Sequence, residues 1–361
     1  MKKLSLAMIV KDEESTLGDC LKNAKEYADE IIIVDTGSQD KTKQVAEKFT
    51  KYVYDFVWQD DFSKARNFAF DKAKYQYIIW LDADDILTEE SVNAIKKWKK
   101  DKEDVDVVMC PYVTSFDKDF KPKFEFYRER IVKNDKNLRW HDPVHEIIVP
   151  SGKVVHNKDI KIYHNKKKKV YTSRNLNIYL KMQENKVNFS PRQKFYFARE
   201  LYYNNMIEQA INQFSQFLSE GKGWKENNIE ACLNLARCYM AKKEKKNALT
   251  ALFGSFVYGV PKGEILYEIG NQFFDDKDYL TAIYWYNLAL SAKMDTTSGA
   301  FYDVNCYTLF PALQLCVCYY KIGDREKAYH YHLISKGFAP DDERVKFNEK
   351  FFEKCKDGSD A

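Results

Sequence analysis

The sequence predicts an α/β domain, with a mostly parallel sheet and helices on both of its faces, followed by an all-α domain of helical hairpins. Two observations carry this prediction. In the first half of the 361 residues, apolar strands alternate with segments in which apolar residues recur at helical spacing. From about residue 190 onward only the helical spacing remains, and a motif repeats.

The strands of the first half are apolar on both faces. Strands are expected at 4–10, 29–38, 52–58 and 75–81, and helices at 14–28, 40–49 and 62–73. Strands of this kind, separated by helices, indicate a parallel sheet that is covered on both faces. Ligands of such sheets bind beyond the carboxyl ends of the strands. Asp12, Asp35 and Asp82 each follow a different strand, so we expect them at one rim.

Residues 103–168 are expected to extend this sheet with antiparallel strands. Strands are expected within 104–113 and 124–134, and shorter ones within 138–149 and 159–165. The four lysines at 166–169 are interpreted as a solvated linker, with contact to phosphate or lipid headgroups as the alternative.

Four segments of the second half share two small residues twelve positions apart, with an aromatic residue or Leu between them. The small residues are Ala198 and Ala210, Ala236 and Ala248, Gly270 and Ala282, and Cys316 and Ala328, and the larger ones are Leu201, Tyr239, Phe273 and Tyr319. Small residues at fixed offsets let two helices approach closely, which is typical of tetratricopeptide repeats of about 34 residues. The 25 Tyr and 24 Phe are therefore interpreted as solenoid core.

Composition excludes several classes of protein. Lys and Arg exceed Asp and Glu by only four, so no nucleic-acid partner is expected. The eight cysteines form no CxxC pair and read as reduced thiols rather than a zinc site or a disulfide framework. The apolar run at 4–10 is too short for a signal peptide, and no run reaches the ~18 residues of a membrane helix. We expect a soluble, cytoplasmic protein.

Three stretches in order, IVKDEESTLGDCL, DEIIIVDTGSQDKT and FSKARNFAFDKAKYQYIIWLDADD, resemble the family 2 glycosyltransferases of the GT-A fold. The resemblance covers about the first 165 residues. It implies a GT-A nucleotide-sugar domain at 1–168. A linker helix is expected at 169–190, tetratricopeptide-like repeats at 191–340, and a C-terminal helix and tail at 341–361.

The resemblance implies a divalent cation, Mg²⁺ or Mn²⁺, which neutralises the diphosphate leaving group. It assigns the cation to Asp84, Asp82 and His164, with Asp85 as a possible substitute. Two alternatives stay open: the acids cap the helix at 88–98, and His164 is a structural histidine.

The nucleotide sugar is assigned to six residues by the same resemblance: Val10, Lys11, Asp35, Arg66, Asp82 and Ala83. Asp35 would accept the uracil N–H, or it is only a turn residue that holds Gly37 and Ser38. Arg66 would face the nucleotide, or it forms a salt bridge to Glu13 or Asp35 that shapes the pocket.

The segment RWHDPVHEII at 139–148 resembles the W-x-x-x-V-H-E segment of family members with a tetratricopeptide tail. An inverting transfer needs a general base, for which Glu146 is the first candidate, His145 the second and Asp142 the third. Alternatively, these are polar residues of a strand whose hydrogen bonds are made by neighbouring groups. Trp140 stacks on a sugar or belongs to the core.

The pairing of the two domains resembles the bacteriocin S-glycosyltransferases of the sublancin type and related peptide O-glycosyltransferases. It implies transfer of glucose or N-acetylglucosamine from a UDP-hexose to a Cys, Ser or Thr of a peptide or protein, and a homodimer through the helical domain. Two alternatives remain: a glycolipid, lipopolysaccharide or capsule acceptor, and a tetratricopeptide scaffold without catalysis.

Overall fold

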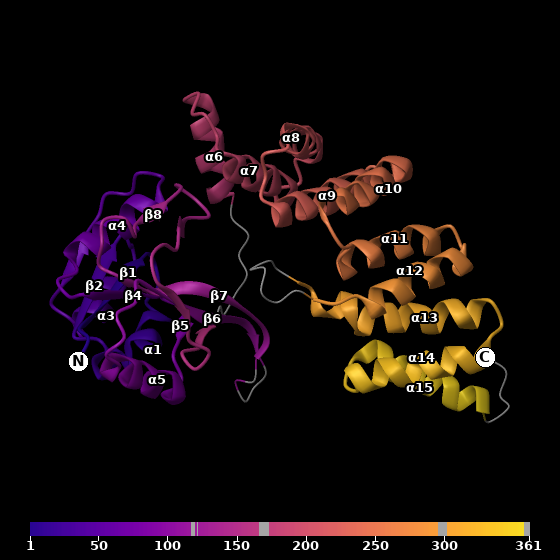
Figure 1. Cartoon of the computed structure of the whole chain (residues 1–361), viewed down its shortest axis with the longest axis horizontal. Helices are drawn as coiled ribbons and strands as arrows, with labels where there is room; N and C mark the ends of the chain where they lie inside the picture. Colours follow the sequence, from indigo (N-terminus) through magenta and orange to yellow (C-terminus); the bar gives the residue numbers. More distant parts are fainter. Residues whose placement is uncertain (117–119, 121, 166–172, 295–301, 357–361) are drawn as a thin grey trace. The chain divides into compact units, whose positions relative to one another are not determined.

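The structure is a computed structural model that describes residues 1–116, 120, 122–165, 173–294 and 302–356. The chain divides into two compact units, Met1–Lys186 and Val187–Ala361 (Figure 1). The lysines at 166–169, interpreted as a linker, lie outside the described residues.

A nine-stranded sheet forms the centre of the first unit. Its strands are β1 (Leu4–Val10), β2 (Glu30–Asp35), β3 (Val53–Asp55), β4 (Tyr77–Trp80), β5 (Asp85–Ile86), β6 (Val107–Phe116), β7 (Pro122–Lys133), β10 (Val154–His156) and β11 (Ile162–His164). The order is β3-β2-β1-β4-β7-β6-β11-β5, with β10 also paired to β6. The first four strands are parallel and β7 is antiparallel to both its neighbours. The predicted α/β class is confirmed.

The extension over residues 103–168 differs in part from the expectation. β6 and β7 are antiparallel as predicted, but β10 and β11 run parallel to β6. Another short pair, β8 (Trp140–His141) and β9 (Ile147–Ile148), forms a separate two-stranded ribbon. Strands of two or three residues carry too little side-chain alternation to reveal their direction.

Helices cover both faces of the sheet. The helices of the first unit are α1 (Leu17–Leu21), α2 (Ala24–Tyr27), α3 (Thr42–Glu47), α4 (Phe62–Lys72), α5 (Glu89–Lys100) and α6 (Arg174–Glu184). Alternate residues of β1 point to opposite faces. Leu6 packs in one core cluster with Ile95 of α5, and Ala7 packs in another with Phe70 of α4.

The second unit consists of helical hairpins, which confirms the tetratricopeptide-like prediction. Its helices are α7 (Pro191–Tyr203), α8 (Ile207–Glu220), α9 (Lys225–Ala241), α10 (Lys245–Gly254), α11 (Gly263–Asp275), α12 (Tyr279–Ser291), α13 (Leu309–Lys321), α14 (Arg325–Phe338) and α15 (Glu343–Lys356), with 3-10 turns η1 (Ser255–Tyr258) and η2 (Val304–Tyr307). Consecutive helices pack in pairs from α7 to α14, and α15 packs on α14 (Figure 1). No helix in the described part of the chain combines the length and apolarity that crossing a membrane requires.

The repeated small residues lie where two helices meet. Ala198, Ala210, Ala236 and Ala248 are fully buried. At Gly270 a Cβ atom would lie 2.6 Å from a ring carbon of Tyr286, the ring that α12 packs against α11. The close approach inferred from the sequence is therefore real at this hairpin.

Candidate functional site

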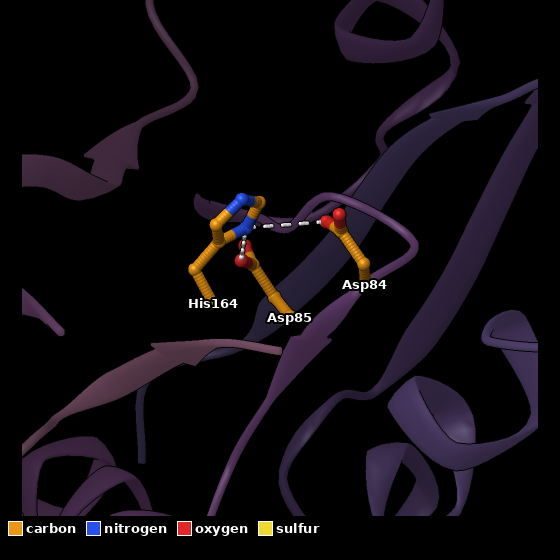
Figure 2. Close-up of side chains that lie close together, drawn as sticks. All are labelled: Asp84, Asp85 and His164. Carbon is orange, nitrogen blue, oxygen red and sulfur yellow. Dashed lines mark ion pairs between the residues drawn. The ribbon is translucent and has the colours of Figure 1, made fainter. Parts of the chain in front are cut away.

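Strand register brings an acidic turn and a histidine together at the rim of the sheet. β5 pairs antiparallel with β11, so that Asp85 lies opposite His164. The Nδ1 atom of His164 lies 3.4 Å from Asp84 Oδ1 and 3.7 Å from Asp85 Oδ1 (Figure 2). One ligand atom from each of the three residues falls within 4.8 Å of the others.

This group fits a hard divalent cation. Two carboxylates and an imidazole form a donor set that Mg²⁺ or Mn²⁺ accepts. Asp85 is fully buried, and its Oδ1 atom accepts no hydrogen bond from any residue that the structure describes. A buried carboxylate oxygen without a donor is costly unless a ligand satisfies it.

The other oxygen of Asp85 is bound to a buried arginine. Arg130 Nη1 donates to Asp85 Oδ2 at 2.9 Å, and both side chains have zero exposure. The backbone N–H of Asp82 donates to the same oxygen at 3.0 Å. The guanidinium lies 3.7 Å from the ring centre of Trp80 and 4.1 Å from that of Tyr112. Asp85 is therefore held with Oδ1 toward His164.

Electrostatics show that the rim favours positive charge. Burial alone would lower the pKa of His164, but its contacts with Asp84 and Asp85 outweigh burial and raise the pKa to about 9. The imidazole therefore carries a proton at neutral pH. A metal ligand must be a neutral imidazole, so a bound cation would take the place of this proton.

A second ion-pair chain lies beside the group. Arg66 donates from Nη2 to Asp82 Oδ1 and from Nε to Glu146 Oε1, both at 2.8 Å. Its guanidinium also lies 4.7 Å from the ring centre of Trp140. Burial would raise the pKa of Asp82, but Arg66 and Arg130 lower it to about 2.

The structure therefore places the predicted cation ligands differently. Asp84 and His164 come together as expected, but the third member of the group is Asp85, and Asp82 is instead paired with Arg66. The salt-bridge alternative for Arg66 named Glu13 and Asp35, whereas its partners are Asp82 and Glu146.

Asp35 holds the turn, as the second of its two suggested roles requires. Its Oδ1 atom accepts hydrogen bonds from the backbone N–H groups of Gly37 and Ser38, both at 2.9 Å. Gly37 has a φ of 103°, which favours glycine. The Oδ2 atom of Asp35 is buried and accepts no hydrogen bond within the described ranges. One oxygen holds the turn while the other is available to an N–H donor.

The remaining predicted nucleotide residues differ in their surroundings. The carbonyl oxygen of Val10 accepts hydrogen bonds from Thr36 N and Thr36 Oγ1, at 3.0 and 3.1 Å, so this acceptor is already used. Lys11 is exposed. Ala83 is 5% exposed and packs in the core that contains Leu81.

The β8–β9 ribbon that carries the candidate bases is fastened to α4. The Asn67 side chain donates to the Trp140 carbonyl and accepts from the Trp140 N–H, both at 2.9 Å. Phe62 N donates to the Pro143 carbonyl at 2.8 Å. Together with the Arg66–Glu146 bond, these contacts fix the loop from three positions of one helix.

Within this loop the predicted residues have distinct environments. Asp142 and His145 adopt φ values of 72° and 54°, a strained conformation that is enriched at functional sites. The His145 ring is stacked with Tyr179 of α6 at a centroid distance of 6.5 Å. Trp140 is 3% exposed and packs on Trp80, so it belongs to the core rather than to a sugar-stacking surface.

Sequence reasoning missed Arg130 entirely and named Asp85 only as a substitute. The pattern FEFYRERIV in β7 did hold a signal, because Arg130 directly precedes the apolar residues Ile131 and Val132 in a strand that the fold buries. A charged residue at a buried strand position requires a buried partner of opposite charge. Naming that partner requires the register between β4, β5, β7 and β11.

Comparison with known proteins places the first unit. Residues 5–163 match the family model "Glycosyl transferase family 2". Over 150 residues the chain is 33% identical to a TPR repeat-containing protein of Synechococcus elongatus, a match that covers 41% of this chain and 36% of that protein. Over 243 residues it is 25% identical to the SPbeta prophage-derived glycosyltransferase SunS of Bacillus subtilis, covering 61% of this chain and 54% of SunS. The chain thus spans about half, or less, of the length of these relatives.

Among solved structures, a likeness is found to S. aureus TarS 1-349 in complex with UDP. The identity is 14%, the TM-score is 0.41, and the match covers 69% of this chain and 90% of that one.

Proposed function

We propose that this chain, which carries a glycosyl transferase family 2 domain over residues 5–163, is an inverting hexosyltransferase that uses a UDP-sugar and Mg²⁺ or Mn²⁺. The acceptor is a Cys, Ser or Thr side chain of a peptide or protein. The observation that carries the proposal is the group of Asp84, Asp85 and His164 at the carboxyl rim of the sheet. Asp84 and Asp85 lie inside the matched segment, and His164 directly follows it.

Charge balance supports a divalent ion at this rim. The four carboxylates of Asp82, Asp84, Asp85 and Glu146 form ion pairs with the guanidinium groups of Arg66 and Arg130 and with the imidazole of His164. Once a bound cation has displaced the proton of His164, these four carboxylates exceed the two guanidinium groups by two negative charges, which a dication offsets. When bound, such an ion neutralises the diphosphate that departs from the sugar.

The chain's own residues provide the other functions. Asp35 Oδ2 accepts an N–H of the nucleobase, since this buried oxygen has no donor among the described residues. Glu146 takes the proton of the acceptor hydroxyl or thiol. Within the described part, only Arg66 donates to Glu146, through Oε1, so Oε2 is available to the acceptor. Arg66 acts as the residue that orients Glu146, rather than as a nucleotide ligand.

The second unit supports a macromolecular acceptor. Stacked helical hairpins form extended surfaces suited to peptides or to self-association, so we propose that this unit binds the acceptor and carries a homodimer contact. The whole protein is proposed to act in the cytoplasm.

The experiment is a turnover assay on the purified full chain. With Mn²⁺, UDP-glucose or UDP-N-acetylglucosamine is expected to release UDP slowly, and Asp84→Asn to abolish the release. Asp71→Asn is the control, since Asp71 is 68% exposed and lies on α4, away from the cation group. Absence of turnover and of UDP binding with every sugar nucleotide would favour a scaffold instead.

Acceptor class needs a separate assay. Peptides containing Cys, Ser or Thr are incubated with the enzyme and the donor, and intact mass is measured. We expect the mass increment of one hexose or one N-acetylhexosamine. Modification of lipid extracts without any peptide product would favour the glycolipid alternative.

A further inference from the structure

We propose that Arg130 is a positioning residue for the cation site, which acts by fixing Asp85 so that Oδ1 faces Asp84 and His164. The inference rests on the cation binding of the proposed function and deepens it. Of the three members of the group, Arg130 donates to Asp85, through Nη1 to Oδ2, and we infer that its influence passes through this bond.

The geometry of Arg130 suits orientation. Its planar guanidinium lies between the rings of Trp80 and Tyr112, and Nη1 donates both to Asp85 Oδ2 and to the Trp80 carbonyl, the latter at 3.3 Å. A group held on two faces and at one edge has little rotational freedom. The carboxylate that it binds is correspondingly fixed.

Stability alone is a poor explanation for this pair. A fully buried ion pair gains little over apolar residues of similar size, because desolvation offsets the attraction. Here the cost is high, since Arg130 Nε and Nη2 are buried and have no hydrogen-bond partner among the described residues. An arginine that leaves two nitrogens unsatisfied is better explained by what it does to Asp85.

Charge supports the same role. Asp84 and Asp85 face one histidine nitrogen, at 3.4 and 3.7 Å. The positive charge of Arg130 offsets Asp85 on the side away from the site. Both acids can then present an oxygen to a single cation while the rim as a whole remains balanced.

The test measures Mn²⁺ binding to the full chain by electron paramagnetic resonance of free Mn²⁺, without sugar nucleotide or acceptor. Arg130→Met is expected to weaken binding at least about tenfold, as loss of residues that orient metal ligands typically does. Arg130→Lys keeps the charge but loses the planar fork, and its affinity is expected to fall between those of the wild type and Arg130→Met.

The matched control is Lys99→Met. Lys99 forms another poorly exposed ion pair of the same unit, with Asp29 at 2.7 Å, and lies on α5 outside the site. Its loss is expected to lower the melting temperature and to leave Mn²⁺ affinity unchanged. A role of Arg130 in stability alone would make the two variants behave alike.

Arg130→Met alone leaves the buried charge of Asp85 unpaired, which could unfold the protein. The double variant Arg130→Met with Asp85→Asn removes both buried charges and avoids this. We expect it to melt closer to the wild type than Arg130→Met does and to bind Mn²⁺ as weakly as Asp85→Asn alone, because Arg130 acts through Asp85. Wild-type Mn²⁺ affinity in Arg130→Met, or a double variant that binds Mn²⁺ clearly more weakly than Asp85→Asn alone, would overturn the inference.

The two proposals fail separately. Mn²⁺ binding that depends on Arg130, without turnover of any sugar nucleotide, would leave the inference standing and remove the transferase. Metal-dependent turnover by the wild type, with unchanged Mn²⁺ affinity in Arg130→Met, would support the transferase and remove the inference about Arg130.

Discussion

Glu146 and Asp82 both bind the guanidinium group of Arg66, and the role proposed for Glu146 can be tested by substitution. Glu146→Gln is expected to lower kcat about 10²- to 10⁴-fold, the usual contribution of a general base, with little change in KM for the donor. The amide keeps an oxygen that can accept from Arg66 Nε, so the loop should stay fastened. Steady-state kinetics with a peptide acceptor measure the effect.

Glu125→Gln is the control for this variant, because Glu125 is an exposed acid on β7 that pairs with Lys161. An unchanged kcat in Glu146→Gln would remove Glu146 from the role of base. The next variant would then be His145→Gln, since His145 neighbours it on the same strained loop.

The sequence could identify an acid of the site only where residues close to it in the chain fix its position. Asp84 and Asp35 follow strands whose apolar pattern is local, and their place at the rim was predictable. The choice between Asp82 and Asp85 depends on the pairing of β5 with β11, nearly 80 residues apart in the chain. Local spacing carries no information about that register.

At the scale of elements, the close contact of α11 and α12 predicts a packing defect. Gly270→Ala would place Cβ at 2.6 and 2.7 Å from two ring carbons of Tyr286, a fully buried side chain. The gain in helix propensity is about 1 kcal/mol, and overpacking costs about 1–3 kcal/mol. Because the Tyr286 ring is fully buried and its hydroxyl donates to Asn271 Oδ1, the ring is held in place, and we expect a net loss of stability of up to about 2 kcal/mol. Urea denaturation followed by circular dichroism measures it.

Gly337→Ala is the control that measures the gain in helix propensity without the packing clash of Gly270→Ala. Gly337 lies in α14, and nothing stands within 4 Å of the position its Cβ would take. This variant should be more stable by up to about 1 kcal/mol. Equal gains at both positions would show that α11 and α12 have room to move apart.

Helices and strands with a long apolar period or a repeated motif were easier to predict than short ones. Strands β1, β2 and β4 and the four hairpins were predicted because each has a sustained apolar period or a repeated small residue. Short strands were predicted within 138–149, but the separation of the β8–β9 ribbon from the main sheet was not, because contacts with Asn67 and Arg66 of α4 hold the ribbon. Its position depends on tertiary contacts.

At the scale of the whole molecule, each unit has its own core, and acid should affect the second one through His332. This side chain is 2% exposed, and burial lowers its pKa from 6.5, while Glu349 opposes the shift and Lys336 adds to it. The unfolded chain gains a proton below about pH 6.5, which the folded unit resists. Stability of the second unit should therefore fall as the pH drops from 7 toward 5.

Thermal melts at several pH values, compared between the wild type and His332→Gln, measure this effect, and the variant should lose much of the slope. His330→Gln is the control, because His330 is exposed two positions away on the same helix. An identical pH slope in all three proteins would show that His332 contributes nothing to it.

The central claim is that Asp84, Asp85 and His164 bind a divalent cation at the rim of the sheet. Anomalous diffraction from crystals of the full chain soaked with MnCl₂ and UDP tests it most directly. The account predicts a manganese peak in contact with all three side chains and with the UDP diphosphate. Density for UDP without manganese at these residues, or manganese bound elsewhere while His164 keeps its contacts with both acids, would contradict it.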